Sequence, residues 1–256
     1  MREENRFTEL RIRKTAEQLM RDGFVKSSKL AEQYGVSMET IRKDLHILEQ
    51  NGIAQKVHGG AILAGEDLEQ EMLYRTVCYN SKQEIGRFAA TFLQGCRTLL
   101  LDSGSTVLAC VRYINKLPRM TVITTSIPAF EALDGDHHDV FLTGGKKREK
   151  NLSLTGAWTE ESLSGIHVDV CFLGTAGIKG CGGPTVHYEP EKEMKRKMVN
   201  HSKEVYVLAD SSKFREKGTN VFAGFDEIDG IITDHGITSS MYTKWNRIVP
   251  VHVSEE

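Results

Sequence analysis

The chain has few cysteines, no long apolar run and no strong net charge of either sign. Its five cysteines are an odd number, lie far apart and include no Cys-x-x-Cys pair. We therefore expect reduced, mostly buried thiols rather than disulfides or a thiolate metal site. No apolar run approaches the ~20 residues that span a membrane, and the first residues lack the apolar core of a signal peptide. These absences favour a cytoplasmic protein that makes no membrane contact.

The histidines and glycines show no spacing that predicts a metal ion or a cofactor. The pair His137-His138 lies in an aspartate-containing segment, 134–139, that could hold a cation, but a solvated turn is the favoured interpretation. The glycines of residues 177–183 do not form a dinucleotide fingerprint, and no Walker loop occurs. We expect neither a metal nor a cofactor.

A helix-turn-helix pattern stands near the N-terminus. Within residues 37–50, apolar side chains recur at i, i+4 and i+7 and predict one buried helix face, with Ser37 as the N-cap. A shorter helix is expected over residues 27–34, and Gly35 suits the turn between the two. The other face of the second helix carries basic and polar side chains, which are typical of a helix that enters the major groove of DNA.

A turn and a short hairpin follow this helix. Asn51-Gly52 is a strong turn signal, and residues 53–60 predict a small wing. A first helix is expected upstream, ending near Asp22-Gly23. Three helices and a wing make a winged helix-turn-helix domain over residues 1–62, which favours binding to double-stranded operator DNA. A winged helix used for protein contacts is the alternative. The side chains expected at the DNA are Ser27, Ser37, Glu39, Thr40, Arg42, Lys43, His46, Lys56 and His58.

The charge of this N-terminal segment is weak. Residues 1–62 carry 11 Lys+Arg against 9 Asp+Glu, a net charge of +2, whereas the whole chain has a net charge of −2. Non-specific affinity for DNA grows with the number of phosphates that are neutralised. A single copy of this N-terminal domain, the head, should therefore bind DNA poorly. We therefore expect a homo-oligomer, either a dimer or a tetramer, that presents two or more heads.

The rest of the chain alternates short apolar strands with helical segments. After a connector at residues 63–80, a capping box at Ser81 predicts a helix that ends near Leu93, and a second helix is expected at 105–116. Strand patterns lie at 98–101, 121–124, 140–143, 168–173, 205–208 and 231–233. This order predicts a largely parallel sheet in an α/β domain over residues 81–256.

Polar and glycine-containing segments follow these strands where each strand ends. Ligands of parallel sheets bind outside the carboxyl ends of the strands, and exposed N–H groups and hydroxyls at a helix start, as at Ser105 and Thr106, favour a phosphate. Lys213 or Lys146 could supply a countercharge. Each segment alone is also compatible with an ordinary loop, and Glu189 with a solvated helix start. The residues expected at a phosphorylated polyol are Asp102, Ser103, Gly104, Ser105, Thr106, Thr124, Thr125, Ser126, Gly145, Arg148, Gly177, Glu189 and Lys213.

Both sets of motifs resemble those of the DeoR family of bacterial transcriptional regulators. The resemblance rests on residues 26–61, with Thr40-Ile41-Arg42-Lys43-Asp44-Leu45 and His58-Gly59-Gly60-Ala61, and on Asp102-x-Gly104-Ser105-Thr106, 124–126, Gly144-Gly145 and 209–214. It implies a sugar-phosphate effector domain similar to ribose-5-phosphate isomerase. It also implies a repressor of a sugar-catabolism operon that is relieved when the phosphorylated sugar binds. One departure is Thr125, where the family usually has Asn, which removes an amide from the pocket edge.

An enzyme is the alternative interpretation. A sugar-phosphate isomerase with an extra domain could use Lys213, Asp169 and Glu189 as acid and base groups. An isomerase needs no winged helix, so we expect a regulator and not an enzyme.

Overall fold

The chain forms two compact units, Met1–Tyr79 and Asn80–Glu256. A computed structural model describes residues 2–22, 24–51, 53–57, 59–63 and 78–255, and the side chains of 2–6, 62 and 63 are not described. Most of the expected connector, 63–80, lies outside the described residues. The domain boundaries expected from the sequence therefore stay predictions, and each unit is considered by itself.

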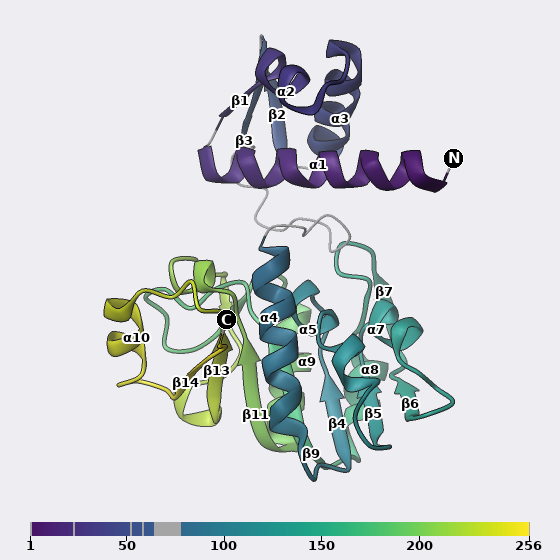
Figure 1. The fold of residues 1–256 in the computed structure, drawn as a ribbon. Coiled ribbons are helices and arrows are strands. Elements are labelled where there is room, and N and C mark those ends of the chain that lie inside the picture. The colour runs from purple at the N-terminus through teal and green to yellow at the C-terminus, as the bar shows by residue number, and fades with distance from the viewer. Residues whose placement is uncertain (1, 23, 52, 58, 64–77, 256) are drawn as a thin grey trace. The chain divides into compact units, whose positions relative to one another are not determined.

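In its described residues, the N-terminal unit contains three helices and a three-stranded antiparallel sheet (Figure 1). Its helices pack around one apolar core, to which Leu30, Ile41, Leu45 and Leu48 contribute fully buried side chains. The expected helix-turn-helix and wing are confirmed. The elements are α1 (Arg2–Asp22), β1 (Phe24–Lys26), α2 (Ser27–Tyr34), α3 (Met38–Gln50), β2 (Ala54–Val57) and β3 (Gly60–Leu63), with sheet order β1-β3-β2.

Two local features define the turn between α2 and α3. Gly35 ends α2 with a φ of 62°, a left-handed conformation that glycine adopts without steric cost. Ser37 begins α3, because its hydroxyl accepts a hydrogen bond from the backbone N–H of Thr40 at 3.1 Å. Both features agree with the turn and the N-cap expected from the sequence.

The C-terminal unit is built on a seven-stranded sheet whose neighbouring strands all pair in parallel (Figure 1). The six expected strands are confirmed, and the seventh, β14, was not predicted. The strand order is β14-β13-β11-β9-β4-β5-β6. The strands are β4 (Thr98–Leu101), β5 (Thr121–Thr124), β6 (Asp139–Leu142), β9 (Val168–Gly174), β11 (Ser202–Leu208), β13 (Gly230–Thr233) and β14 (Val251–Val253).

Helices cover both faces of this sheet, because successive side chains of a strand point to opposite faces. Leu99 and Leu101 pack in one core with α4 to α7, whereas Leu100 packs in a second core with α8 to α10. The helices are α4 (Tyr79–Ala89), α5 (Ser105–Leu108), α6 (Val111–Ile114), α7 (Ile127–Ala132), α8 (Ala157–Ser164), α9 (Glu189–Asn200) and α10 (Ser239–Trp245).

Several local expectations are corrected. The helix expected to start at Ser81 begins two residues earlier, at Tyr79, so Ser81 lies inside its first turn. The helix expected at 105–116 is divided into α5 and α6. Two small antiparallel pairs were not predicted. They are β7 (Lys146–Arg148) with β8 (Ser153–Thr155), and β10 (Thr185–Val186) with β12 (Asn220–Val221).

The order of the strands reverses between β4 and β9. From β4 the chain proceeds through β5 to β6 on one side, and then returns to place β9 on the other side of β4, followed by β11, β13 and β14. The carboxyl ends of β4 and β9 therefore form a topological switch point, where ligands of open α/β sheets bind.

The structure also bears on the expectations about cysteines, metals and membranes. Cys96, Cys110, Cys171 and Cys181 are free thiols, and burial raises the pKa of the Cys110 and Cys171 thiols. Within the described ranges, no three His, Cys, Asp or Glu side chains are grouped as a metal site would require, and no helix has the length and apolar character that crossing a membrane demands.

Candidate functional site

One side of α3 presents polar and basic side chains to solvent. Its apolar stripe, Ile41, Leu45 and Leu48, is buried in the head. Seven of the residues expected at DNA lie on the exposed or half-exposed surface of α3 and β2. They are Ser37, Glu39, Thr40, Arg42, Lys43, His46 and Lys56.

The other two residues expected at DNA differ from this group. Ser27 is buried, with 5% of its surface exposed, and its backbone N–H donates to the carbonyl of Gly59 at 2.9 Å. Ser27 therefore joins α2 to the wing turn and does not present its side chain to a ligand. His58 lies outside the described residues.

Glu49 ties the wing to α3. Its carboxylate accepts the backbone N–H of Lys56 at 2.9 Å, and the Lys56 ammonium lies 3.3 Å from the same carboxylate. These contacts, above all the backbone hydrogen bond, lower the pKa of Glu49. His46 is also close, with its Nδ1 atom 3.5 Å from Lys56 Nζ. The basic group of the wing is thus held beside the basic face of α3.

A second ion pair fixes α3 against α1. Arg11 donates from Nε and Nη2 to the two carboxylate oxygens of Asp44, at 2.5 and 3.1 Å. Asp44 lies on the buried side of α3, so this two-pronged contact determines how α3 sits in the head. The sequence analysis grouped Asp44 with the family motif and missed its partner.

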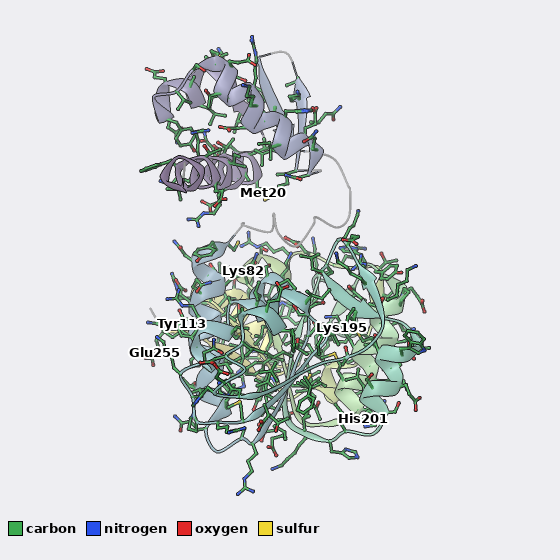
Figure 2. All side chains as sticks on the ribbon, turned by 90° about the vertical axis from the view of Figure 1, so that its right-hand side faces the viewer. Met20, Lys82, Tyr113, Lys195, His201 and Glu255 are labelled. Carbon is green, nitrogen blue, oxygen red and sulfur yellow. The ribbon has the colours of Figure 1, made fainter. Side chains whose placement is uncertain are left out.

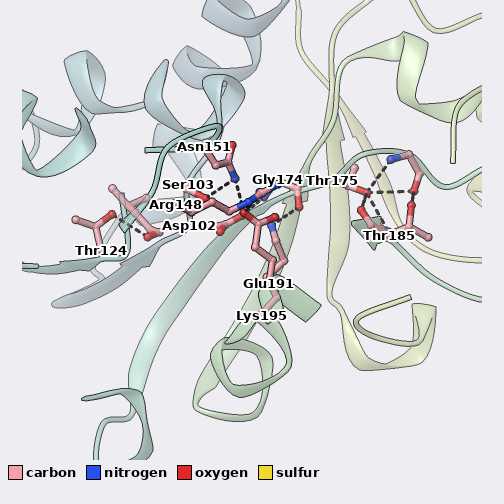
Figure 3. A network of polar contacts seen from close by, with 12 residues as sticks. Asp102, Ser103, Thr124, Arg148, Asn151, Gly174, Thr175, Thr185, Glu191 and Lys195 are labelled. Carbon is pink, nitrogen blue, oxygen red and sulfur yellow. Dashed lines mark hydrogen bonds and ion pairs between the residues drawn. The ribbon is translucent and has the colours of Figure 1, made fainter. Parts of the chain in front are cut away.

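The C-terminal unit contains a buried network of charged and polar side chains at the switch point (Figure 3). Asp102, the first residue after β4, forms an ion pair with Lys195 of α9. Asp102 also accepts the backbone N–H of Gly174 at 2.8 Å, and Lys195 donates to the Gly174 carbonyl at 2.8 Å. Lys195 thus lies inside the C-terminal unit (Figure 2) and joins the ends of β4 and β9.

A second ion pair adjoins the first. Arg148 of β7 donates to Glu191 of α9 at 2.5 Å, and the same carboxylate oxygen accepts a hydrogen bond from the Asn151 amide at 2.7 Å. The Asn151 amide also lies 3.0 Å from the hydroxyl of Ser103. The Arg148 guanidinium stacks over the Tyr188 ring, 4.2 Å from its centroid. Four separate segments therefore meet at one polar cluster.

Several buried polar atoms in or near this polar cluster have no hydrogen-bond partner within the described part of the chain. They include Oδ1 of Asp102, Oδ1 of Asn151, Oγ1 of Thr125 and Oγ of Ser153. The segment after β7 reaches β5 here, because the Leu154 N–H donates to the Thr125 carbonyl at 2.8 Å. A buried polar group without a partner costs about 1–3 kcal/mol. A polar ligand could form hydrogen bonds with these atoms.

Only some of the residues predicted at the effector site belong to this network. Asp102, Ser103 and Arg148 belong to the network, and residues 104–106 form the adjoining loop and the start of α5. Thr124 and Ser126 are buried beside it but serve the backbone. The Thr124 hydroxyl donates to the Leu101 carbonyl and accepts the Ser126 N–H, and the Ser126 hydroxyl caps α7.

Four other proposed residues are placed outside the network. Glu189 is exposed at the first turn of α9. Lys213 forms an ion pair with Glu216, three residues further on. Gly177 lies where a Cβ would be 2.2 Å from the backbone of Glu216, and Gly145 where a Cβ would be 2.0 Å from the Thr159 hydroxyl. The two glycines permit close packing instead of lining the polar cluster.

Glu191, Lys195 and Asn151 belong to the network but were not predicted from the sequence. A signal for two of them existed, since the buried side of α9 consists of Glu191, Met194, Lys195, Met198 and Val199, at i, i+3, i+4, i+7 and i+8. Two charges inside an otherwise apolar stripe indicate a buried ion-pair network. Asn151 lies in a loop and gave no comparable signal.

The three residues proposed for the alternative isomerase, Lys213, Asp169 and Glu189, do not lie together. Asp169 lies at the start of β9, the end of the sheet opposite to the network, and accepts hydrogen bonds from the backbone N–H groups of Arg97 and Thr98 at 2.9 and 3.0 Å. These bonds lower its pKa. Asp169 therefore holds the beginning of β4. It lies at the opposite end of the sheet from Lys213 and Glu189, which come after the carboxyl ends of strands.

Comparisons with known proteins match both units. Residues 11–66 match the DeoR-like helix-turn-helix domain, and residues 77–235 match the DeoR C terminal sensor domain. The HTH-type transcriptional regulator GolR of Listeria innocua is 32% identical over 86% of this chain and 88% of its own length. The HTH-type transcriptional repressor GlcR of Bacillus subtilis is 35% identical over 78% of each chain. A lactose phosphotransferase system repressor of Staphylococcus epidermidis is 30% identical over 83% of this chain and 86% of its own length.

Solved structures were compared as well. Ribose 5 phosphate isomerase A from Neisseria gonorrhoeae aligns with 52% of this chain and 52% of its own chain, with 17% identity and a TM-score of 0.37. Similarity at this low sequence identity and TM-score implies nothing about activity.

Proposed function

Because this chain belongs to the DeoR family of transcriptional regulators, we propose that it represses a sugar-use operon and that a phosphorylated sugar controls its affinity for operator DNA. A relative from Staphylococcus epidermidis is named a lactose phosphotransferase system repressor. The proposal assigns DNA binding to the head and effector binding to the C-terminal unit. A regulator of chromosomal genes acts in the cytoplasm, and it needs no enzymatic step.

In the head, Arg42 and Lys43 would contact bases or phosphates from the exposed face of α3. Thr40 and Lys56 would hold the DNA backbone, with Lys56 positioned by Glu49. The net charge of +2 over residues 1–62 is low for tight binding. We therefore propose that the regulator works as a homo-oligomer whose paired heads bind together.

In the C-terminal unit, the unpartnered buried atoms of the polar cluster are the observation that carries the proposal. Oδ1 of Asp102, Oδ1 of Asn151 and Oγ1 of Thr125 would bond the hydroxyls of a sugar. The phosphate would lie toward the 104–106 loop, where backbone N–H groups and the hydroxyls of Ser105 and Thr106 favour an anion. Arg148, which pairs with Glu191 in the cluster, would contribute a guanidinium to this site.

Control of DNA affinity requires that the sugar phosphate bind one state of the regulator better than another. The shift in operator affinity cannot exceed that difference, which is typically about 1–3 kcal/mol. We propose that the operator-releasing state is the one favoured by the ligand. No phosphoryl or hydride transfer is involved.

The experiment is a thermal-shift screen of the full chain against pentose and hexose phosphates, with the unphosphorylated sugars as controls. A ligand of the native state raises the melting temperature as its concentration increases. The proposal requires that at least one sugar phosphate stabilise the protein and that its parent sugar fail to do so at the same concentration. If no sugar phosphate shifts the transition, the proposed effector class is wrong.

A further inference from the structure

The two edges of the seven-stranded sheet differ in what they expose. At one edge, β14 has Val251 buried and His252 and Val253 half-buried. At the other edge lies β6 (Figure 1). This strand exposes Asp139 and Phe141, and 58% of the Phe141 surface is accessible to water. An open edge with an exposed aromatic side chain can template pairing with another strand, and soluble proteins ordinarily avoid it or use it.

A second aromatic residue lies close to this edge. Trp158 of α8 is 78% exposed, and it adjoins the end of β6, since a Cβ on Gly144 would lie 3.9 Å from the Trp158 Cβ. Phe141 pairs with Ile123 of β5, and Ile123 packs against the same core as Leu163 of α8. Phe141 and α8 are thus on one face of the sheet, which gives the edge an apolar side.

The two ends of β6 differ in net charge, although Asp139 pairs with Arg119 at 2.6 Å and Lys147 pairs with Glu149 at 2.9 Å. Exposed Asp134, Asp136 and Asp139 precede or begin the strand, whereas exposed Lys146 and Lys147 follow it. Two copies of such a strand placed antiparallel would bring the acidic end of each beside the basic end of the other. Placed parallel, they would bring like charges together. The charge pattern is therefore self-complementary for a second copy of this chain in the antiparallel direction.

The backbone of β6 fixes the register of such a pair. The N–H groups of Asp139 and Thr143 donate to Met120 and Thr124 of the inner side, at 3.1 and 3.0 Å. Because backbone groups alternate along a strand, those of Val140 and Leu142 point away from the sheet. A two-fold axis at Phe141 pairs Val140 of each copy with Leu142 of the other, so that all the outward groups are bonded.

We propose that β6 pairs antiparallel with β6 of a second copy, with Phe141 on the two-fold axis, so that one continuous sheet runs through a dimer. In this register the two Phe141 rings face each other as a close, non-hydrogen-bonded pair. Asp136 of each copy lies nearest to Lys146 of the other. The inference rests on the proposed need for paired heads, but its test uses the association of the protein without DNA or sugar.

The first test compares two lysine substitutions by sedimentation of the full chain at micromolar concentration. Phe141→Lys sets two like charges opposite each other and should convert the dimer to a monomer. Ile248→Lys, at a residue that is 51% exposed between α10 and β14, should leave the dimer intact. A monomeric wild-type protein, or a Phe141→Lys variant that stays dimeric with an unchanged circular dichroism spectrum, would overturn the proposal.

The second test reads the register by cross-linking. Opposed Cα atoms of a non-hydrogen-bonded antiparallel pair lie about 4.5 Å apart, which permits a disulfide. Phe141→Cys should therefore form a covalent dimer under mild oxidation, beyond any background from the wild-type cysteines. Asp139→Cys should not, because the two copies of residue 139 lie on opposite sides of the axis. Equal cross-linking of both variants, or of neither, contradicts the register centred on Phe141.

A charge exchange completes the design. Asp136→Lys and Lys146→Asp should each raise the dissociation constant of the dimer, by several-fold at low ionic strength, since each places like charges near one another. The double variant restores opposite charges and should recover dimerisation. If the double variant is weaker than both single variants, the two residues do not face each other.

Discussion

Lys195 of α9 forms an ion pair with Asp102 at the end of β4, and both side chains are buried, with 3% and 0% of their surface exposed. Taking two charges out of water is costly, and an ion pair of this kind contributes little net stability compared with apolar residues. It lies at the switch point, beside buried atoms without partners in the described part of the chain, and we propose that it serves ligand binding.

Removing one member of this pair should destabilise the C-terminal unit. Lys195→Met leaves the Asp102 carboxylate buried without its counter-charge, which costs about 3–5 kcal/mol. Urea denaturation should show this loss, and the double variant with Asp102→Asn should recover part of it. A Lys195→Met protein within about 1 kcal/mol of wild type would mean that the ion pair does not stabilise the C-terminal unit.

Two neighbouring threonines offer a matched pair for the effector site. The Thr125 hydroxyl is buried without a partner, whereas the Thr124 hydroxyl bonds Leu101 and Ser126. Thr125→Val should change the free energy of unfolding by less than about 1 kcal/mol but weaken sugar-phosphate binding, because it removes a hydroxyl reserved for the ligand. Thr124→Val should instead lose about 1–3 kcal/mol of stability.

Calorimetry of unfolding and ligand titration together separate these effects. If Thr125→Val binds the sugar phosphate as tightly as wild type, its hydroxyl does not reach the ligand, and the location of the site is in doubt.

Substitutions on α3 should weaken operator binding without unfolding the head. Arg42→Ala and Lys43→Ala should each cost roughly 1–3 kcal/mol if they contact bases, since both side chains are exposed and take no part in the head's apolar core. Lys203→Ala removes a lysine that is also exposed, from the C-terminal unit, and is the control. Fluorescence anisotropy with an operator duplex measures the effect; unchanged affinity of both variants would exclude them from the interface.

The Arg11–Asp44 pair should stabilise the head. Asp44→Ala breaks two charge-assisted hydrogen bonds and should lower the stability of the N-terminal unit by roughly 1.5–3 kcal/mol. Hydrogen exchange of α1 and α3 amides localises the loss. Faster exchange only in the C-terminal unit would disagree with this role.

Stability should fall as the pH falls below about 6.5. Burial lowers the pKa of His138, whose Nδ1 accepts the Met120 N–H and whose Nε2 lies 3.1 Å from the Ile114 carbonyl, so the ring is held neutral. The unfolded chain then binds a proton that the folded chain resists, and stability is lost from the unfolded pKa near 6.5 down to the lower folded pKa.

The urea midpoint at pH 7.5 and at pH 5.5 measures this loss. His138→Gln should reduce the difference between the two midpoints and leave a remainder, because burial also lowers the pKa of His252. A variant with the same pH dependence as wild type would show that His138 is not the titrating group.

Local patterns in the sequence predicted the winged head and most of the sheet, because those elements follow from short-range rules. Gly35 and Ser37 specify the turn and the helix start by their own chemistry. Strand β4, with its four-residue Thr98–Leu101 pattern, was placed correctly since both of its faces are covered. The small strand β14 carries only three residues and no comparable pattern.

The candidate site was harder to predict, because it depends on contacts between distant segments. Position after a strand identified Asp102 and Ser103, but the partners of these residues come from α9 and from the loop that contains Asn151, 93 and 48 positions away. The choice of Glu189 followed from its place at a helix start, whereas the buried face of α9 selects Glu191. Periodicity would have identified Glu191 and Lys195, whereas Asn151 needed the fold.

A phosphorylated sugar bound at the end of β4 should weaken operator binding. A titration of the wild-type protein–operator complex with the sugar phosphate that stabilises the protein, followed by fluorescence anisotropy, measures this effect. We predict that the ligand raises the apparent dissociation constant for the operator about 5–150-fold, and that Thr125→Val needs a higher concentration for the same effect. An operator affinity that no sugar phosphate changes would contradict the account.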